Sequence, residues 1–361
     1  MLLATLVTVL NLVGLVMVLS SSTVQSIRTF GSPWHYFIRE VLWMVIGVAV
    51  FAVAYRVDYH RWRRFARIAM GVTVVMLMAV LVPGIGVSVS GASRWIGTSS
   101  VQIQPSELAK VALIFFAADV LDRRADHGRW RYRMGPVLVV LVLLVVLVMK
   151  QPDMGTSMIL AVIAFAILFA AGSPLRTLCG FLGVAIAGSL VLAVAAPYRW
   201  ARMTSFLHPT RDTSSTGYQF VQGLVSMGSG GLLGTGLGSS ISSWGYLPNQ
   251  QTDFIFAVIA EETGLVGSLF VVGLFIALTL VGVRVACRAA DRFGALVAAG
   301  VTAWLAVQAL INIGAVVGLL PVTGVPLPFI SYGGSSLVFS LFAVGVLANV
   351  ASGPDPEVSA G

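Results

Sequence analysis

Long apolar runs alternate with short polar segments along almost the whole chain. A helix needs about 20 consecutive apolar residues to cross a membrane. Ten runs approach this length: 2–20, 37–55, 65–83, 106–121, 134–149, 155–171, 178–197, 254–281, 294–317 and 334–351. The fourth to sixth runs are short and need tilt or a place inside a bundle, whereas the eighth is long enough to begin as a buried half-helix. The pattern predicts an all-α polytopic membrane protein with about ten transmembrane helices.

Composition narrows the class of protein further. Of the 361 residues, 58% are hydrophobic and 10% are charged, whereas soluble domains are about 45–50% apolar and about 25% charged. The net charge of +8 would suggest nucleic acid as the partner of a soluble protein. Here the arginines fall in short loops between apolar runs, so the membrane surface explains them better and no nucleic acid is expected. Cys179 and Cys287 lie near predicted cytoplasmic helix ends, so a structural disulfide is not expected. Neither belongs to a CxxC pair.

Lys and Arg in the loops set the expected orientation, because cytoplasmic loops carry an excess of both residues. With the N-terminus in the cytoplasm, the inner loops hold 14 of the 22 basic residues. These 14 are Arg56, Arg61, Arg63, Arg64, Arg67, Arg123, Arg124, Arg129, Arg131, Arg133, Arg176, Arg284, Arg288 and Arg292. An even number of spans then places the C-terminus on the same side. We therefore expect a multi-pass protein of the cytoplasmic (inner) membrane with both termini in the cytoplasm.

The expected organisation is a single transmembrane domain over 1–352 and a short cytoplasmic tail, 353–361. The tail has two prolines and no apolar run, so it is expected to be disordered. The first apolar run lacks a positively charged start, which favours a retained span over a cleaved signal peptide. Three unusual segments fall on the outer face, and their aromatic and aliphatic residues favour packed structure: 84–105, 198–253 and 318–333. The second, between spans seven and eight, is by far the longest loop, and long loops are usually functional or disordered.

Asp253 is the leading candidate for a catalytic residue. It lies where a polar loop gives way to an apolar run, and a desolvated, unpaired carboxylate there costs several kcal/mol. One interpretation is a helix N-cap at the start of 254–260, because Asp is a preferred cap. The other is a general base or cation-binding carboxylate that faces an outer cavity, and one residue can do both. Glu261 and Glu262 point about 100° apart, so at most one is expected to share the face of Asp253.

A second charged pair lies at the start of the fourth span. In QPSELAK (104–110), Pro105 or Ser106 suits a helix start, and Glu107 and Lys110 lie three residues apart on one helix face. The pair is either a buried ion pair that neutralises itself or part of the lining of a polar substrate cavity. Ionisable groups inside membranes favour the second interpretation.

Several basic residues on the outer face are candidates for binding an anionic ligand. Arg94 is either an interfacial anchor or a phosphate contact, because Arg presents a bidentate fork. Lys150 shares a very short turn with Asp153, which fits either a solvated turn with a local ion pair or a ligand contact. Three arginines give the longest loop a basic character that suits an anionic ligand or lipid headgroups: Arg199, Arg202 and Arg211.

Other familiar chemistries lack their motifs. The sequence has no GxxxxGK[ST] phosphate loop and no HExxH, and its four histidines are scattered, so a histidine metal cage is not expected. The Gly- and Pro-rich segment 318–334 breaks helical structure, which membrane proteins tolerate where the segment lines a cavity or is buried in protein. Gln308 and Asn312, one turn apart in the preceding span, are expected to satisfy the backbone groups that this break frees.

Seven segments of the chain resemble the SEDS family, the RodA and FtsW proteins of cell-wall synthesis. They are SGASRWIG (90–97), QPSELAK (104–110), KQPDMGTS (150–157), GYQ (217–219), GGLLGTGLG (230–238), LPNQQTDFIFAVIAEETGLVG (247–267) and GLLPVTGVPLPFISYGGSS (318–336). The resemblance covers nearly the whole chain, and the ten spans with a large outer loop after the seventh are also similar to that family. The segments GSPWHYFIRE and TDFIFAV look more like FtsW than RodA.

The resemblance implies a peptidoglycan glycosyltransferase that polymerises lipid II, the undecaprenyl-pyrophosphate-linked disaccharide peptide, on the outer face of the membrane. In the family, the acid of the TDF segment is the essential carboxylate, and it falls on Asp253. The Glu and Lys of the QPSE segment line the same cavity and fall on Glu107 and Lys110. An Arg early in the second span falls on Arg39. The family often has Arg-Gln there, whereas Glu40 follows Arg39 here, and this chain has PNQQTDF where relatives often have PEAHTDF.

The resemblance also implies a partner and leaves the cofactor open. The family pairs with a single-span class B penicillin-binding protein, from which crosslinking is expected to come. Lys or Arg, with or without a divalent cation that Asp253 can bind, would stabilise a leaving pyrophosphate. The candidate substrate contacts are Arg39, Arg94, Glu107, Lys110, Lys150, Arg199 and Arg202.

Two other functions stay open at this point. One is a lipid II flippase, and the other is a scaffold for the penicillin-binding protein. The elaborate loops fall almost wholly on the outer face, which argues against a flippase because alternating access needs machinery at both faces. A pure scaffold would not need an acid such as Asp253 at the mouth of a cavity.

Overall fold

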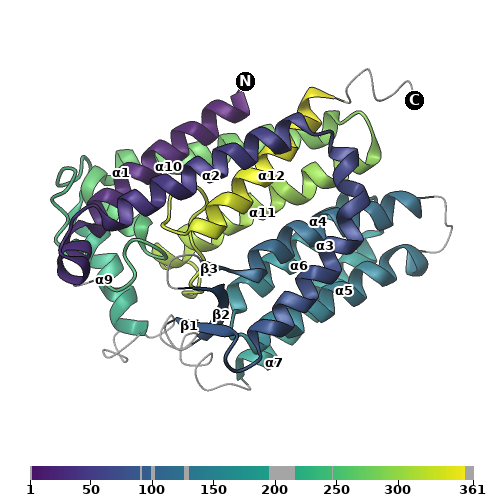
Figure 1. Cartoon of the computed structure of the whole chain (residues 1–361), viewed down its shortest axis with the longest axis horizontal. Coiled ribbons are helices and arrows are strands. Elements are labelled where there is room, and N and C mark those ends of the chain that lie inside the picture. The colour runs from purple at the N-terminus through teal and green to yellow at the C-terminus, as the bar shows by residue number, and fades with distance from the viewer. Residues whose placement is uncertain are drawn as a thin grey trace. The chain divides into compact units, whose positions relative to one another are not determined.

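The computed structural model describes residues 2–89, 92–98, 102–125, 130–194, 216–245 and 247–353. Its helices, drawn in Figure 1, are α1 (Leu2–Phe30), α2 (His35–Arg56), α3 (Tyr59–Val80), α4 (Pro105–Arg123), α5 (Trp130–Lys150), α6 (Met154–Ala170), α7 (Leu175–Val194), α9 (Thr216–Ser229), α10 (Ile255–Arg288), α11 (Arg292–Val316) and α12 (Gly334–Ser352). A 3-10 helix, η1, covers Ser242–Trp244. Three strands complete the secondary structure: β1 (Gly86–Val89), β2 (Ala92–Gly97) and β3 (Gln102–Ile103).

Each apolar run that predicts a span coincides with one of these helices. Six helices are long and apolar enough to cross a membrane: α1, α2, α5, α10, α11 and α12. Helix α6 is a shorter apolar helix. The prediction of a helical polytopic membrane fold is therefore confirmed, and the number of ten spans stays a prediction. Residues 354–361, the main part of the predicted disordered tail, lie outside the described residues.

The chain divides into two compact units, each built from separate stretches of sequence. The first unit contains Met1–Trp43, Gly183–Leu278 and Gln308–Gly333. The second contains Met44–Leu182, Thr279–Val307 and Gly334–Gly361. Asp253 and Arg39 belong to the first unit, whereas Arg94, Glu107, Lys110 and Lys150 belong to the second.

In the first unit, α1 packs along the segments that surround Asp253. A Cβ atom built at Gly14 would lie 2.4 Å from the carbonyl oxygen of Phe329, so only glycine permits this close approach of α1 to the 318–333 segment. The side chain of Gln250 donates a hydrogen bond of 2.7 Å to the carbonyl oxygen of Ser21. Helix α1 therefore holds both the Gly/Pro-rich segment and the loop before α10.

Helix α10 is broken near its beginning. Gly264 has a φ of 68°, so the helix is interrupted there and continues as 265–288. The prediction that the long apolar stretch begins as a half-helix is confirmed in this form. The loop after α9 donates to the carbonyl oxygens of Glu261 and Glu262 through its backbone N–H groups at Thr235 and Gly236. The carbonyl oxygens freed at the break are therefore hydrogen-bonded within the protein. Irregular backbone at membrane depth requires such internal hydrogen bonds.

In the second unit, α4 packs against α3, α5 and α6, and these four helices lie together in Figure 1. Gly300 on α11 fits closely between Ile114 and Ile167, whose side-chain atoms would lie 3.0 Å and 2.8 Å from a Cβ atom at this position. The three strands form an antiparallel sheet in the order β1-β2-β3, between α3 and α4 in sequence. The pattern of apolar residues does not predict this sheet, because the strands are short and contain several Gly and Ser residues.

Candidate active site

Asp253 lies in the turn 251–254, directly before α10, and its side chain is partly exposed. Three successive carbonyl oxygens of this turn each accept a hydrogen bond. Tyr332 N–H donates to Gln251 (2.8 Å), Ser331 Oγ donates to Thr252 (2.6 Å), and Asn312 Nδ2 donates to Asp253 (2.9 Å). The backbone that carries the carboxylate is therefore fixed by α11 and by the 318–333 segment.

The Gly/Pro-rich segment is held by the same α11 residues. Asn312 Nδ2 also donates to the carbonyl oxygen of Val325 (2.8 Å), and Gln308 Nε2 donates to that of Pro326 (3.0 Å). The prediction that Gln308 and Asn312 satisfy the freed backbone is confirmed. The sequence did not show the further role of Asn312, which joins the segment to the carbonyl of Asp253.

Gly324 lies beside the carboxylate of Asp253. A Cβ atom built at Gly324 would lie 3.5 Å from Asp253 Oδ2, and Gly324 has a φ of 74°. A side chain there would be strained and would occupy space next to the carboxylate. The glycine therefore leaves room on this side of the acid.

Arg39 is close enough to Tyr332 for its charge to act on the phenol, and Tyr332 N–H donates to the turn that carries Asp253. Burial raises the pKa of the Tyr332 phenol to about 12, and the positive charge of Arg39 opposes this shift. Tyr332 also packs edge to face on Tyr36, with ring centroids 5.2 Å apart. Glu40 is buried and accepts a backbone hydrogen bond from Gly333. The start of α2 thus brings Arg39 to the same segment that holds the Asp253 turn, and its role as a substrate contact stays a prediction.

The carboxylates of Glu261 and Glu262 accept hydrogen bonds from serine hydroxyls and, for Glu261, from a backbone N–H group. Glu261 accepts hydrogen bonds from Ser240 Oγ (2.7 Å), from Ile241 N–H (2.8 Å) and from Ser242 Oγ. Glu262 accepts one from Ser20 Oγ at 2.5 Å. Both carboxylates are buried. They hold the loop after α9 and helix α1 in place, and neither forms a salt bridge in the part of the chain that the structure describes.

In the second unit, Glu107 and Lys110 form a buried ion pair. The Lys110 ammonium lies 2.7 Å from Glu107 Oε1, and the two side chains are 1% and 3% exposed. The ammonium also lies 4.7 Å from the ring centroid of Trp304, within the range of a cation–π contact. Glu107 sits in the first turn of α4, where the helix dipole favours a negative charge. The ion pair predicted from the spacing is confirmed, and its role as a cavity lining stays a prediction.

Arg94 on β2 has a structural role that the sequence did not reveal. Its guanidinium donates to the carbonyl oxygens of Gln151 (3.0 Å) and Pro152, which ties the sheet to the turn between α5 and α6. Lys150, the last residue of α5 before that turn, is exposed. Asp153 is buried and caps α6 by accepting from Thr156 N–H (3.0 Å), so the expected solvated turn with a local ion pair is wrong for Asp153. Pyrophosphate binding by Arg94 and Lys150 stays a prediction.

Three of the candidate arginines cannot be placed: Arg199, Arg202 and Arg211 lie outside the described residues. In the described ranges, no group of three or more His, Cys, Asp and Glu side chains is arranged to hold a metal ion.

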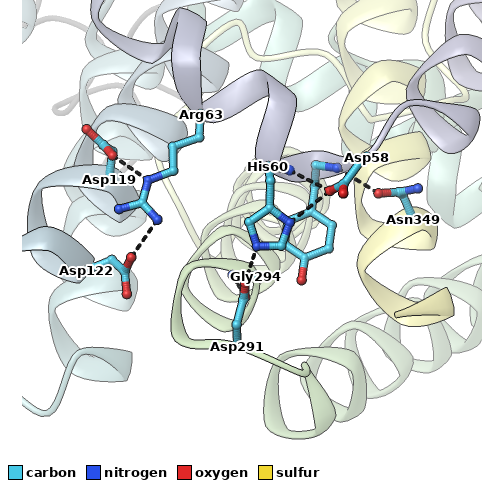
Figure 2. Close-up of polar contacts among 9 residues, drawn as sticks. Asp58, His60, Arg63, Asp119, Asp122, Asp291, Gly294 and Asn349 are labelled. Carbon is cyan, nitrogen blue, oxygen red and sulfur yellow. Dashed lines mark hydrogen bonds and ion pairs between the residues drawn. The ribbon is translucent and has the colours of Figure 1, made fainter. Parts of the chain in front are cut away.

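A separate polar cluster lies at the start of α3, within the second unit (Figure 2). The His60 ring bridges two carboxylates, with Nδ1 2.9 Å from Asp58 Oδ1 and Nε2 2.5 Å from Asp291 Oδ2. Beside it, the Arg63 guanidinium lies 2.7 Å from Asp119 and 2.8 Å from Asp122. Arg63 therefore does more than mark the expected cytoplasmic side, because it joins α3 to α4.

The fold and the polar groups at the start of α10 define an α-helical integral membrane protein. The chain belongs to the FtsW/RodA/SpoVE family of cell cycle proteins, whose family model matches residues 1–354. It is 39% identical over 340 residues to the probable peptidoglycan glycosyltransferase FtsW of Geobacter metallireducens, covering 94% of this chain and 91% of that protein. It is 40% identical over 352 residues to stage V sporulation protein E of Bacillus subtilis, covering 97% and 96%.

Solved structures show the same fold. RodA of Thermus thermophilus matches with a TM-score of 0.72 and 26% identity, covering 97% of this chain and 95% of that one. A chain from a peptidoglycan synthase complex, described as coordinating polymerization and crosslinking, matches with a TM-score of 0.80 and 27% identity. That match covers 97% of this chain and 96% of the other. The family predicted from the sequence motifs is therefore confirmed.

Proposed function

We propose that this protein is a peptidoglycan glycosyltransferase that polymerises lipid II into glycan strands and releases undecaprenyl pyrophosphate. The reaction would take place at the outer face of the cytoplasmic membrane, with both termini in the cytoplasm, during division or elongation. The observation that carries the proposal is the Asp253 turn: a partly exposed carboxylate on a backbone fixed at three successive carbonyls. A base must be held in place in this way to act on a bound hydroxyl.

In this mechanism, Asp253 is the general base. A sugar hydroxyl attacks the anomeric carbon of a sugar linked to undecaprenyl pyrophosphate. The hydroxyl proton passes to the Asp253 carboxylate, the new glycosidic bond forms, and the bond to the pyrophosphate oxygen breaks. Gly324 leaves room beside Oδ2 for the approaching hydroxyl.

The leaving pyrophosphate gains negative charge, which cationic side chains stabilise. Arg39 suits this role because it lies near Tyr332, whose backbone holds the Asp253 turn. Lys110, paired with Glu107, is a second candidate contact of the substrate. Arg94, Lys150, Arg199 and Arg202 complete the proposed set of contacts. A divalent cation bound at Asp253 would stabilise the negative charge of the leaving pyrophosphate in the same way.

A flippase remains the main competing function, and the break in α10 bears on it. Broken helices in transporters often leave their free backbone groups to bind the cargo. Here the carbonyl oxygens of Glu261 and Glu262 accept from Thr235 and Gly236 N–H, at 2.9 Å and 3.1 Å. Because the chain itself occupies the break, this feature does not favour transport. A class B penicillin-binding protein is the partner we propose, since a structural relative comes from a peptidoglycan synthase complex described as coordinating polymerization and crosslinking.

The test is polymerisation of lipid II by purified protein, with and without a class B penicillin-binding protein, with glycan length read on a gel. We compare wild type with Asp253→Asn, which keeps the size of the side chain and removes the base. The matched control is Asp291→Asn, the same change at the His60 cluster of the second unit. Wild type and control should make polymer, and Asp253→Asn should make none.

Thermal unfolding of each sample verifies that it is folded. Folded Asp253→Asn that polymerises at the wild-type rate would rule out the base role. Folded wild type that makes no polymer with any partner, but moves lipid II across vesicles, would replace the proposed function with transport. Activity that disappears with a chelator and returns with Mg²⁺ or Mn²⁺ would establish the cation requirement.

A further inference from the structure

The loop that follows α9 belongs to a long stretch without charge. Residues 213–252 contain no Asp, Glu, Lys, Arg or His over 40 consecutive positions. At the 10% of charged residues found in the whole chain, about four would be expected in this stretch, and about ten at the share typical of soluble domains. A connecting segment in water normally carries charge, so this composition indicates a different environment.

Within this stretch, residues 230–245, which we name the leucine loop, are fixed on the break of α10. Leu265 N–H donates to the carbonyl oxygen of Gly231 (3.0 Å), and Val266 N–H donates to that of Leu232 (3.2 Å). Thr235 and Gly236 donate in the opposite direction, to the carbonyls before the break. Four backbone hydrogen bonds thus hold the loop against the helix and satisfy polar groups that lipid could not.

Glycines at the contact let the backbone of the leucine loop approach the backbone of α10 closely. A Cβ atom at Gly234 would lie 2.1 Å from the carbonyl oxygen of Glu262, and one at Gly264 would lie 2.4 Å from Gly234 N. Gly230 approaches the carbonyl oxygen of Ala260 equally closely, at 2.0 Å. The position of the leucine loop on α10 is therefore set by backbone contacts and does not depend on its apolar side chains.

Those apolar side chains point away from the protein. Leu232 is 69% exposed and Leu233 is 81% exposed, and Leu237, Ile241 and Trp244 are exposed as well. The polar side chains Ser240 and Ser242 are buried, because they donate to Glu261. A loop in water normally buries its leucines, whereas this loop exposes Leu232, Leu233 and Leu237 and turns Ser240 and Ser242 inward.

The exposed leucines continue the apolar surface of α10. Leu265 and Val266, bonded to the loop, are exposed, as are Leu269 and Phe270 one turn further along. Helix residues 265–288 are about 36 Å long at 1.5 Å per residue, enough to cross a hydrocarbon core of about 30 Å. The break, and the loop bonded to it, therefore fall near one edge of that core. Trp244 suits this depth, because Trp is enriched at membrane interfaces.

We propose that the leucine loop is embedded in the lipid bilayer, with Leu232, Leu233 and Leu237 in the acyl-chain region of one leaflet. In the orientation with a cytoplasmic N-terminus, this is the outer leaflet. Lipid is the occupant that the structure favours, because the loop's apolar face is continuous with the exposed face of a membrane span and the loop carries no charged side chain. The inference needs only a membrane-spanning α10, so it stands independently of the glycosyltransferase activity.

The test measures which environment each position contacts. In a background with both native cysteines replaced, Cys179→Ser and Cys287→Ser, single cysteines are introduced by Leu233→Cys and Leu237→Cys. Each carries a nitroxide label in the full chain, reconstituted in nanodiscs without any partner protein. Power-saturation EPR then gives the collision rates with O2, which concentrates in lipid, and with a water-soluble nickel chelate. Leu269→Cys serves as the lipid control, and Ala290→Cys, in the exposed loop after α10, serves as the water control.

We expect labels at 233 and 237 to match the lipid control, with frequent O2 collisions and few nickel collisions. Nickel collisions as frequent as at Ala290→Cys would overturn the proposal and assign the loop to water. Protection from both reagents would also overturn it, because it would mean that protein covers the leucines. Two labelled positions keep the test decisive if one variant fails to fold.

Discussion

Replacing Asn312 by Ala removes the side chain that joins α11, the Gly/Pro-rich segment and the Asp253 turn. Two carbonyl oxygens, those of Asp253 and Val325, lose their hydrogen bonds of 2.9 Å and 2.8 Å. At about 1 kcal/mol for each hydrogen bond, with a further cost for any carbonyl left unsatisfied, the free energy of unfolding should fall by about 2–3 kcal/mol. The freed turn should also lower kcat for lipid II polymerisation about 10- to 100-fold, as a barrier increase of about 1.4–2.7 kcal/mol requires.

Gln308→Ala is the matched control for this variant. It removes a neighbouring amide that binds the same segment at Pro326, at 3.0 Å, while the Asn312 bond to the Asp253 carbonyl is kept. Initial rates are measured below the unfolding transition of every sample, and thermal unfolding reports stability. We expect Gln308→Ala to lose stability with a nearly normal kcat. If the two variants lose activity only in proportion to their loss of stability, Asn312 has no positioning role for Asp253.

Three further predictions concern single groups. Gly324→Ala should lower lipid II polymerisation, because it adds a methyl group 3.5 Å from Asp253 Oδ2 at a strained φ; an unchanged rate would contradict the proposed approach of the hydroxyl. Lys110→Met should destabilise the protein by about 3–5 kcal/mol in thermal unfolding by leaving Glu107 buried without its cation, and adding Glu107→Gln should restore much of that loss. Because burial raises the Tyr332 pKa to about 12, its contribution to stability is complete below pH 10 and is lost as the pH rises toward 12; Tyr332→Phe should reduce this alkaline loss in a pH series of thermal unfolding.

The sequence predicts most of the helices because each apolar run must bury itself in lipid or in protein. It also predicts contacts within one helix, such as the pair Glu107 and Lys110, since a spacing of three places both on one face. Gln308 and Asn312 were predictable for a related reason. A broken segment must find donors for its carbonyl oxygens, and these amides lie in the preceding span.

Contacts between distant segments were not predictable. Nothing near Arg94 in the sequence indicates that it binds the carbonyl oxygens of Gln151 and Pro152. The break at Gly264 could not be predicted, because a single glycine inside an apolar run is compatible with a continuous helix. The contacts of Gly264 with the leucine loop appear only in the folded structure. The short strands β1–β3 are set by pairing with one another, and a few residues rich in Gly and Ser do not show that pairing in advance.

The break at Gly264 also separates two tasks that one straight helix would have to combine. As an unbroken rod, the 34 residues of α10 would be about 51 Å long, well beyond the hydrocarbon thickness of about 30 Å, so tilt would have to absorb the difference. With the break, residues 265–288 can adjust their tilt to the bilayer while residues 255–263 keep the direction that their contacts with α1 and the leucine loop impose. The carboxylate of Asp253 is thereby held in the frame of the protein, whatever the thickness of the membrane around it.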